Sequence, residues 1–220
     1  MLKTTLIYEQ PQDYYDIFSY MLSLKENASI RELVNKVERS STVYQNKIDE
    51  QAGLFFDSEE AKCAYVKDKV NKYKGDLLEI FSEIFFLEYQ ADPAVGVKDY
   101  TPVSITDDYG VDAIGFNVNG HKVAIQVKYR ANITDRIDYE SVAKTFTSAV
   151  CQHSVDPTND NIIYVLTTAQ GCEYPPEKVL AGKLITISKS IIANKVDGNL
   201  IFWENAYKAV YEKLDQEQPV

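Results

Sequence analysis

The fold of this chain is decided by residues 111–129, which read VDAIGFNVNGHKVAIQVKY. Two runs in this stretch, Val111–Val118 and Lys122–Tyr129, have the composition and alternation that are typical of β-strands. They are separated by Asn119-Gly120, a dipeptide that strongly favours a β-hairpin turn. The sequence therefore predicts a two-stranded hairpin, and the rest of the fold is built outward from it.

Three polar side chains stand out in this hairpin. Gln126 and Lys128 alternate with apolar residues, so both project from one face of the second strand, while Asp112 stands at the mouth of the first. A two-residue turn would place Asp112 opposite Val127, on the other face. A three-residue loop over residues 118–120, with its glycine in the left-handed conformation, places Asp112 opposite Gln126. A site shared by these residues therefore requires the bulged hairpin or an equivalent one-residue irregularity.

A second source of polar groups is the preceding segment, Gly75–Gln90, which predicts a helix that is apolar nearly all round and buried on most sides. Glu79 lies in this helix, where a buried carboxylate must be protonated or must find a counter-charge. Glu83 lies one turn further on and shares its face. Taken singly, each polar residue of the helix and hairpin is at least as often an exposed position as a functional one. Their ordered combination points to a site.

The remaining pattern predicts one mixed sheet covered by helices on both faces, an α/β fold. A helix is expected over Tyr139–Gln152, a buried strand over Asn161–Thr168 and a short strand over Lys183–Ile187. An amphipathic helix, Trp203–Leu214, follows. We expect these elements to form one core domain over residues 74–220.

Residues 1–73 are predicted to form a helical N-terminal module that recognises DNA or dimerises. Helices are expected over Gln10–Lys25, Ser29–Glu38 and Ser41–Leu54, and a long helical segment begins at Ser58. The second and third helices have the spacing of a helix-turn-helix, although short amphipathic helix pairs are common in proteins of every function.

The charge distribution is uneven. The chain has a net charge of −10, which by itself disfavours a nucleic-acid partner. Residues 75–118, however, hold Lys98 alone against nine acids, so 8 of the 10 excess negative charges lie in one fifth of the chain. A solvated acidic loop accounts for part of this cluster. The sharper interpretation is that some of these carboxylates bind divalent cations, which would reverse the sign of the local field.

Several other classes of function are disfavoured. The three cysteines are scattered and the only histidines are His121 and His153, so zinc knuckles, His₃ zinc sites and disulfide frameworks are not expected. Neither Gly-x-Ser-x-Gly nor a phosphate-binding Gly-Lys-Ser/Thr loop occurs. The apolar stretches are too short to span a membrane, and the first residues lack the apolar core of a signal peptide, so we expect a cytoplasmic protein.

Three motifs follow in order along the chain: Gly75-Asp76-Leu77-Leu78-Glu79, Asp108-Tyr109-Gly110-Val111-Asp112 and Gln126-Val127-Lys128. Together they resemble the PD-(D/E)xK nuclease superfamily, particularly its Mrr-like restriction branch. The resemblance covers about residues 74–190. Two departures are that no proline precedes Asp112 and that Gln126 replaces the usual acid, a substitution that the Mrr-like branch tolerates.

The resemblance implies a restriction endonuclease-like α/β/α core and a Mg²⁺-dependent endonuclease, with Mn²⁺ as a possible substitute for the metal. Asp112 corresponds to the central metal ligand and Glu79 to the ligand from the helix. The Gln126 side chain and the Val127 carbonyl would add neutral oxygens, and Lys128 would orient the attacking water. Hard oxygen ligands of this kind suit magnesium.

The implied substrate is double-stranded DNA, cut by an enzyme of the restriction or mobile-element type. Lys122, Arg130, Arg136 and Lys144 are the candidates for binding its phosphates. Cleavage of both strands of a two-fold symmetric duplex suggests a homodimer. Two alternatives stay open: a structure-selective nuclease similar to a junction resolvase, and a catalytically silent module that retains the nuclease fold and binds DNA or protein.

Overall fold

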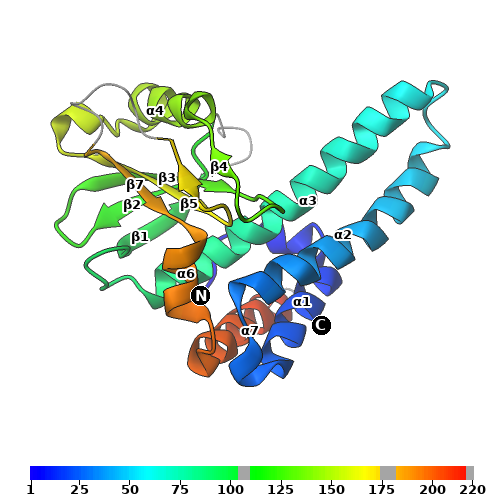
Figure 1. The fold of residues 1–220 in the computed structure, drawn as a ribbon, viewed down its shortest axis with the longest axis horizontal. Coiled ribbons are helices and arrows are strands. Elements are labelled where there is room, and N and C mark those ends of the chain that lie inside the picture. The colour runs from blue at the N-terminus through cyan, green and yellow to red at the C-terminus, as the bar shows by residue number, and fades with distance from the viewer. Residues whose placement is uncertain (104–109, 174–181, 217–220) are drawn as a thin grey trace.

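The computed structural model describes residues 1–103, 110–173 and 182–216, so Asp108 and Tyr109 of the second motif lie outside the described residues. It confirms the α/β fold with a mixed central sheet and a helical N-terminal region (Figure 1). The five strands of the sheet lie in the order β1-β2-β3-β5-β7; β1, β2 and β3 are antiparallel neighbours, and β3, β5 and β7 are parallel. These strands are β1 (Val97–Pro102), β2 (Ala113–Asn117), β3 (Lys122–Lys128), β5 (Ile162–Thr167) and β7 (Leu184–Ile187).

The hairpin of β2 and β3 has the three-residue loop that a shared site requires. Ala113 pairs with Ile125 in the ladder, and the last bonded pair joins the Asn117 N–H to the His121 carbonyl at 2.9 Å. Gly120 has φ +81°, the left-handed conformation that closes such a loop. The predicted three-residue loop is therefore confirmed, but the paired ladder ends at Ala113 and Ile125, so Asp112 is not paired with Gln126.

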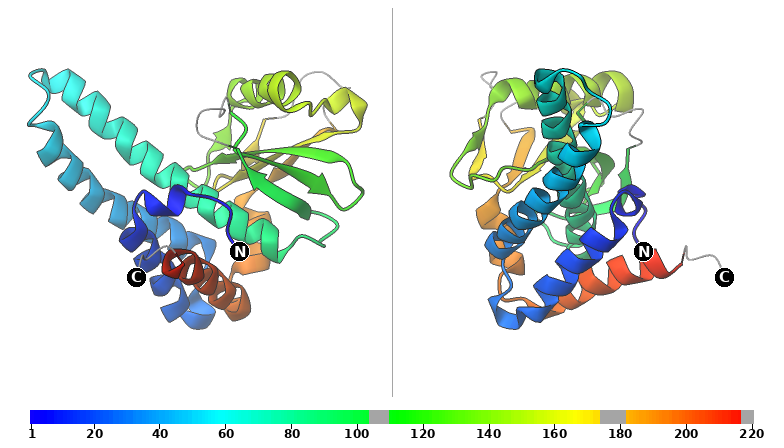
Figure 2. Two further views of the ribbon diagram at one scale, coloured as in Figure 1. Left: turned by 180° about the vertical axis from the view of Figure 1, so that it is seen from behind. Right: turned by 90° about the vertical axis from the view of Figure 1, so that its right-hand side faces the viewer.

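Helices cover both faces of the sheet (Figures 1 and 2). The helix α4 (Tyr139–His153) packs on one face, and α3 (Glu59–Glu88) packs on the other with its C-terminal half. A small parallel sheet of β4 (Arg136–Ile137) and β6 (Gly171–Cys172) adjoins α4. Because the two faces are buried against different helices, neighbouring residues of β3 face different surroundings.

The N-terminal region does not form the predicted helix-turn-helix. One continuous helix, α2 (Ile30–Ala52), replaces the two short helices that the sequence suggested. The hydroxyls of Ser41 and Thr42 donate to the Glu38 carbonyl at 2.9 and 3.0 Å, so both residues remain inside the helix instead of opening a turn. The prediction of a helix-turn-helix that reads DNA is therefore wrong.

The boundary predicted between residues 73 and 74 falls inside α3. One hydrophobic core contains Leu2, residues of α2, the apolar half of α3 and Val210 near the C-terminal end. The remaining helices surround α3 on the side away from the sheet and at its flanks. These are η1 (Leu6–Tyr8), α1 (Pro11–Ser23), η2 (Lys25–Asn27), α6 (Lys189–Val196) and α7 (Leu200–Asp215). The exception is η4 (Pro157–Asn159), which follows α4 and lies beside it.

The distal halves of α2 and α3 form an antiparallel arm that extends beyond the sheet (Figures 1 and 2). A separate small core of Ile48, Ala52, Val66 and Val70 joins the two helices there. Within the described residues, no helix is both long and apolar enough to cross a membrane.

Close contact between β1 and β2 leads to a stability prediction. A Cβ atom at Gly115 would lie 2.5 Å from Val97 Cγ1 and 2.8 Å from the Lys98 carbonyl oxygen, so the two strands would have to separate. We expect Gly115→Ala to lower the free energy of unfolding by about 1–3 kcal/mol. The matched control is Gly75→Ala in α3, where a Cβ would meet no atom within 4 Å apart from its chain neighbours and the helix's own backbone, and alanine should raise stability by about 0.5–1 kcal/mol. Urea unfolding followed by circular dichroism measures both; equal stability of Gly115→Ala and wild type would contradict the strand contact.

Candidate active site

The backbone at Asp112 departs from the regular ladder. Its N–H donates to the Ile125 carbonyl at 2.8 Å, although Ile125 is already paired with Ala113. Its own carbonyl accepts from the Val103 N–H at 2.9 Å, on the opposite side of the strand. A residue whose N–H and C=O point to different neighbouring strands is the mark of a β-bulge, which re-aims the side chain.

The bulge brings the Asp112 carboxylate to the end of β3, where its Oδ2 atom accepts the backbone N–H of Val127. The carboxylate thus replaces a strand partner at the point where β2 has not yet begun. In a regular strand, the N–H and C=O groups of one residue point to the same neighbouring strand. The Val127 carbonyl therefore also faces the start of β2, as the predicted ligand set requires.

Asp112 and Glu79 line one cavity of about 730 Å³ between α3, the start of β2 and the first residues of the chain. The acids also affect the pKa of Tyr100, a buried residue of β1. Burial raises the pKa of Tyr100 well above its ordinary value, and the negative charges of Glu83, Glu79 and Asp112 raise it further. Both carboxylates that the sequence assigned to one site therefore line this cavity.

Glu83, one turn from Glu79, has a different role. Its side chain is fully buried, and its two oxygens accept the backbone N–H groups of Lys3 and Thr4, the latter at 2.9 Å. Burial raises the pKa of Glu83, and these two hydrogen bonds oppose the rise. Glu83 therefore anchors the N-terminal segment as one wall of the cavity.

Asp76, from the first motif, also lines the cavity but is already paired. The Lys72 ammonium lies 2.6 Å from its carboxylate, one helical turn away on α3. Burial raises the pKa of Asp76, whereas the hydrogen bond from Lys72 lowers it. Asp76 is thus held by a neighbour in its own helix, and it is not one of the two carboxylates of the candidate site.

Gln126 and Lys128 lie on the other side of β3. Gln126 is 1% exposed and faces α4, with its Nε2 atom 3.5 Å from the position that a Cβ at Gly110 would take. Its Oε1 atom is buried without a hydrogen-bond partner among the described residues. Lys128 is half-buried on the same face, and its ammonium makes no hydrogen bond or ion pair within the described part of the chain. Neither side chain lines the cavity of Asp112 and Glu79.

The four cations proposed to bind DNA are dispersed. Lys122 starts β3, so it lies roughly 20 Å from Lys128, and its ammonium donates to the His153 carbonyl at 2.6 Å. This contact binds Lys122 to the C-terminal end of α4. It therefore lies at the edge of the sheet opposite to the candidate site.

The other three cations lie nearer the site. Arg130 follows β3, where its guanidinium donates to the Tyr129 carbonyl at 2.9 Å. Arg136 is exposed on β4. Lys144 is exposed on α4, and its carbonyl carbon lies 3.9 Å from the Cβ position of Gly110, beside the turn that leads into Asp112.

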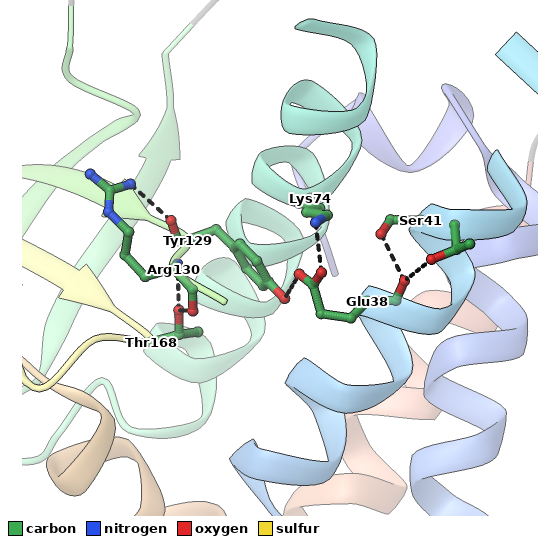
Figure 3. Close-up of polar contacts among 7 residues, drawn as sticks. Glu38, Ser41, Lys74, Tyr129, Arg130 and Thr168 are labelled. Atoms are coloured by element: carbon green, nitrogen blue, oxygen red, sulfur yellow. Dashed lines mark hydrogen bonds and ion pairs between the residues drawn. The ribbon is translucent and has the colours of Figure 1, made fainter. Parts of the chain in front are cut away.

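Sequence reasoning missed a cluster that joins the helical region to the end of β3 (Figure 3). The Tyr129 hydroxyl donates to Glu38 Oε1 at 2.7 Å, and the Lys74 ammonium donates to Glu38 Oε2 at 2.8 Å. Burial raises the pKa of the Tyr129 hydroxyl, as does the Glu38 carboxylate. No pattern in the sequence could reveal this contact, because Glu38 and Tyr129 are 91 residues apart.

The donor set can be compared with the needs of a metal. Within residues 1–103, 110–173 and 182–216, no group of three histidine, cysteine, aspartate or glutamate residues is placed to hold an ion. Two carboxylates, from Asp112 and Glu79, with the Val127 carbonyl make an incomplete set of hard oxygens. That set fits Mg²⁺, which keeps several waters and takes substrate phosphate oxygens. It does not fit a metal that needs a closed protein cage.

Comparison with protein-family models and with curated proteins finds no match for this chain.

The anchoring of the N-terminal segment is testable. Glu83→Gln leaves one acceptor oxygen for two backbone N–H donors and turns an amide N–H against one of them. We expect it to lower the free energy of unfolding by about 1–3 kcal/mol, since a buried donor is left unsatisfied. Hydrogen exchange at residues 3–6 should rise by more than the global loss of stability explains. Glu204→Gln, exposed on α7, is the control and should change stability by less than about 0.5 kcal/mol.

Proposed function

We propose that this protein is a Mg²⁺-dependent endonuclease that hydrolyses phosphodiester bonds of double-stranded DNA on a restriction endonuclease-like core. One observation carries the proposal. A β-bulge at Asp112 turns its carboxylate into the cavity that Glu79 lines, beside the backbone of Val127. Side chains of the first two motifs, on the buried helix and at the start of β2, thus line one acidic cavity, while the side chains of Gln126 and Lys128 in the third motif do not.

The residues of the cavity have distinct roles in this proposal. Asp112 and Glu79, with the Val127 carbonyl, would hold the ion. Mg²⁺, when bound, lowers the pKa of a coordinated water and neutralises charge that develops on the phosphate. The Val127 N–H keeps the Asp112 carboxylate in one orientation, so less reorganisation is needed when substrate binds.

Lys128 and Gln126 belong to the second half of the proposal. Lys128 lies at the end of β3 without an ion-pair partner in the described chain. It does not line the cavity, so as our candidate for orienting the nucleophile it would have to reach past the strand end from the α4 side. Arg130, Arg136 and Lys144 lie on that side as well and are proposed to bind the DNA backbone. A homodimer would present two such sites to the two strands of a duplex.

A second candidate function is favoured by one specific observation. Gln126 is fully buried away from the cavity, with its oxygen unpartnered among the described residues, and Lys128 does not line the cavity. A chain that retains the nuclease fold but binds DNA or protein without cutting would tolerate this arrangement. The two functions differ in whether a carboxylate charge at residue 112 is needed for turnover.

Plasmid nicking with Mg²⁺ is the decisive experiment. Asp112→Asn keeps an oxygen for the Val127 N–H but removes the charge, so its free energy of unfolding should change by no more than about 1 kcal/mol. Its nicking rate should fall at least about 100-fold, since even residues that only orient metal ligands are worth 10- to 100-fold. Glu79→Gln should lose about 10- to 100-fold.

The matched control is Asp215→Asn. Asp215 is exposed at the end of α7 and does not line the cavity, so this variant should nick at the wild-type rate. Wild type that binds duplex DNA yet never nicks it supports the silent module instead. Faster cutting of a cruciform than of linear duplex would replace the restriction-type substrate with a junction.

A further inference from the structure

A second cavity, of about 740 Å³, opens at the carboxyl ends of the parallel strands. Its walls come from the segments that follow β3, β5 and β7 and from the start of α2, so it is assembled from four parts of the chain. The polar residues that matter to its chemistry are Ser29, Arg31, Thr134, Gln170, Lys189 and Asp197.

Two cations face this cavity without ion-pair partners among the described residues, Arg31 from α2 and Lys189 from α6. Burial lowers the pKa of Lys189, and the neighbouring positive charge of Arg31 lowers it further, whereas Asp197 raises it. Asp197 is the one acid among the described lining residues, and its Oδ1 atom already accepts the Ile30 N–H at 2.7 Å. Two like charges held together in a hollow favour an anion as the ligand.

The position of this cavity relates it to the candidate active site. Asp112 lies at the carboxyl end of β3, and the second cavity lies at the same edge of the sheet, next to β5 and β7. Neighbouring strands are about 4.8 Å apart, so two to three strand spacings separate the sites by roughly 10–15 Å. One DNA strand rises about 3.4 Å per nucleotide, so the same distance corresponds to about three to four nucleotides.

We propose that Arg31 and Lys189 bind a backbone phosphate of the DNA substrate about three to four nucleotides from the cleaved bond. The inference rests on the proposed nuclease function and adds a substrate contact to it. The Gln170 side chain supplies a neutral hydrogen-bond donor beside the same phosphate, whereas the Thr134 hydroxyl already donates to Asn132 Oδ1 at 2.8 Å. The N-terminal helical region then contributes to DNA binding through a phosphate contact by α2.

The salt dependence of DNA binding tests this site without cleavage. Fluorescence anisotropy in EDTA measures the affinity of a 30-base-pair duplex over a series of salt concentrations; at roughly 100 Å this duplex is much longer than the separation of the two sites. In the double variant Arg31→Gln/Lys189→Gln, the slope of log affinity against log salt should fall by about 0.9, the loss of one neutralised phosphate. Lys183→Gln, which precedes β7 at the opposite edge and loses only a surface ion pair with Asp160, should keep the wild-type slope.

The outcomes separate the two proposals. An unchanged slope in the double variant, with wild type binding DNA normally, overturns the phosphate site and leaves the nuclease proposal standing. Absence of duplex binding by wild type at low salt overturns both. The last measurement uses inorganic phosphate. Suppose that phosphate raises the melting temperature of wild type but not of the double variant, while both proteins bind DNA equally well. The cavity then binds free phosphate, and its assignment to a DNA phosphate is wrong.

Discussion

The hydrogen bond from the Val127 N–H to the Asp112 carboxylate is the contact on which the candidate site depends. At the end of β3, a backbone donor needs an acceptor, because an unsatisfied buried N–H costs about 1–3 kcal/mol. The bulge at Asp112 supplies a side-chain oxygen where the ladder supplies no backbone one. The same bond gives the carboxylate one orientation toward the cavity of Glu79. Asp112 therefore has a structural role, as the acceptor for the Val127 N–H, and a proposed chemical role, as a metal ligand. Only a substitution by a side chain of the same shape, such as Asp112→Asn, can separate the two.

The acids of the charged segment divide into two kinds. Asp76 and Glu83 are buried and satisfied, the first by Lys72 and the second by the backbone of the N-terminal segment. Their cost of desolvation is met by partners within the fold, so they hold the walls of the cavity in place. Asp112 and Glu79 line the cavity, as Asp76 does, and they are the two carboxylates assigned to the candidate site. The net charge of −10 is consequently a poor guide to function, because the local field at each site is set by a few residues and their partners.

Much of the fold was predictable because its signals are local. The three-residue loop at Gly120, the buried helix that carries Glu79 and the strand Ile162–Thr167 follow from periodicity and turn chemistry. Strand β1 was missed because its burial does not alternate, and its pairing with β2 shifts register between Lys98 and Thr101. The short helix α6 was missed because its eight residues carry too little periodic signal. The helix-turn-helix was wrong because hydroxyl residues near Glu38 bond to their own helix instead of ending it.

By itself, the sequence determined the hairpin and its loop, the buried helix that carries Glu79 and the strand Ile162–Thr167, and which polar groups would be costly to bury there. These properties depend on neighbours within a few positions along the chain. Only the tertiary structure decided where those polar groups point. A single bulge turned Asp112 toward Glu79, while Gln126 and Lys128 stayed on the face of α4. The contact of Glu38 with Tyr129 and the cavity shared by Arg31 and Lys189 join residues far apart in the chain. The physical reason is that the aim of a side chain depends on backbone irregularity and long-range packing, and neither leaves a local pattern in the sequence.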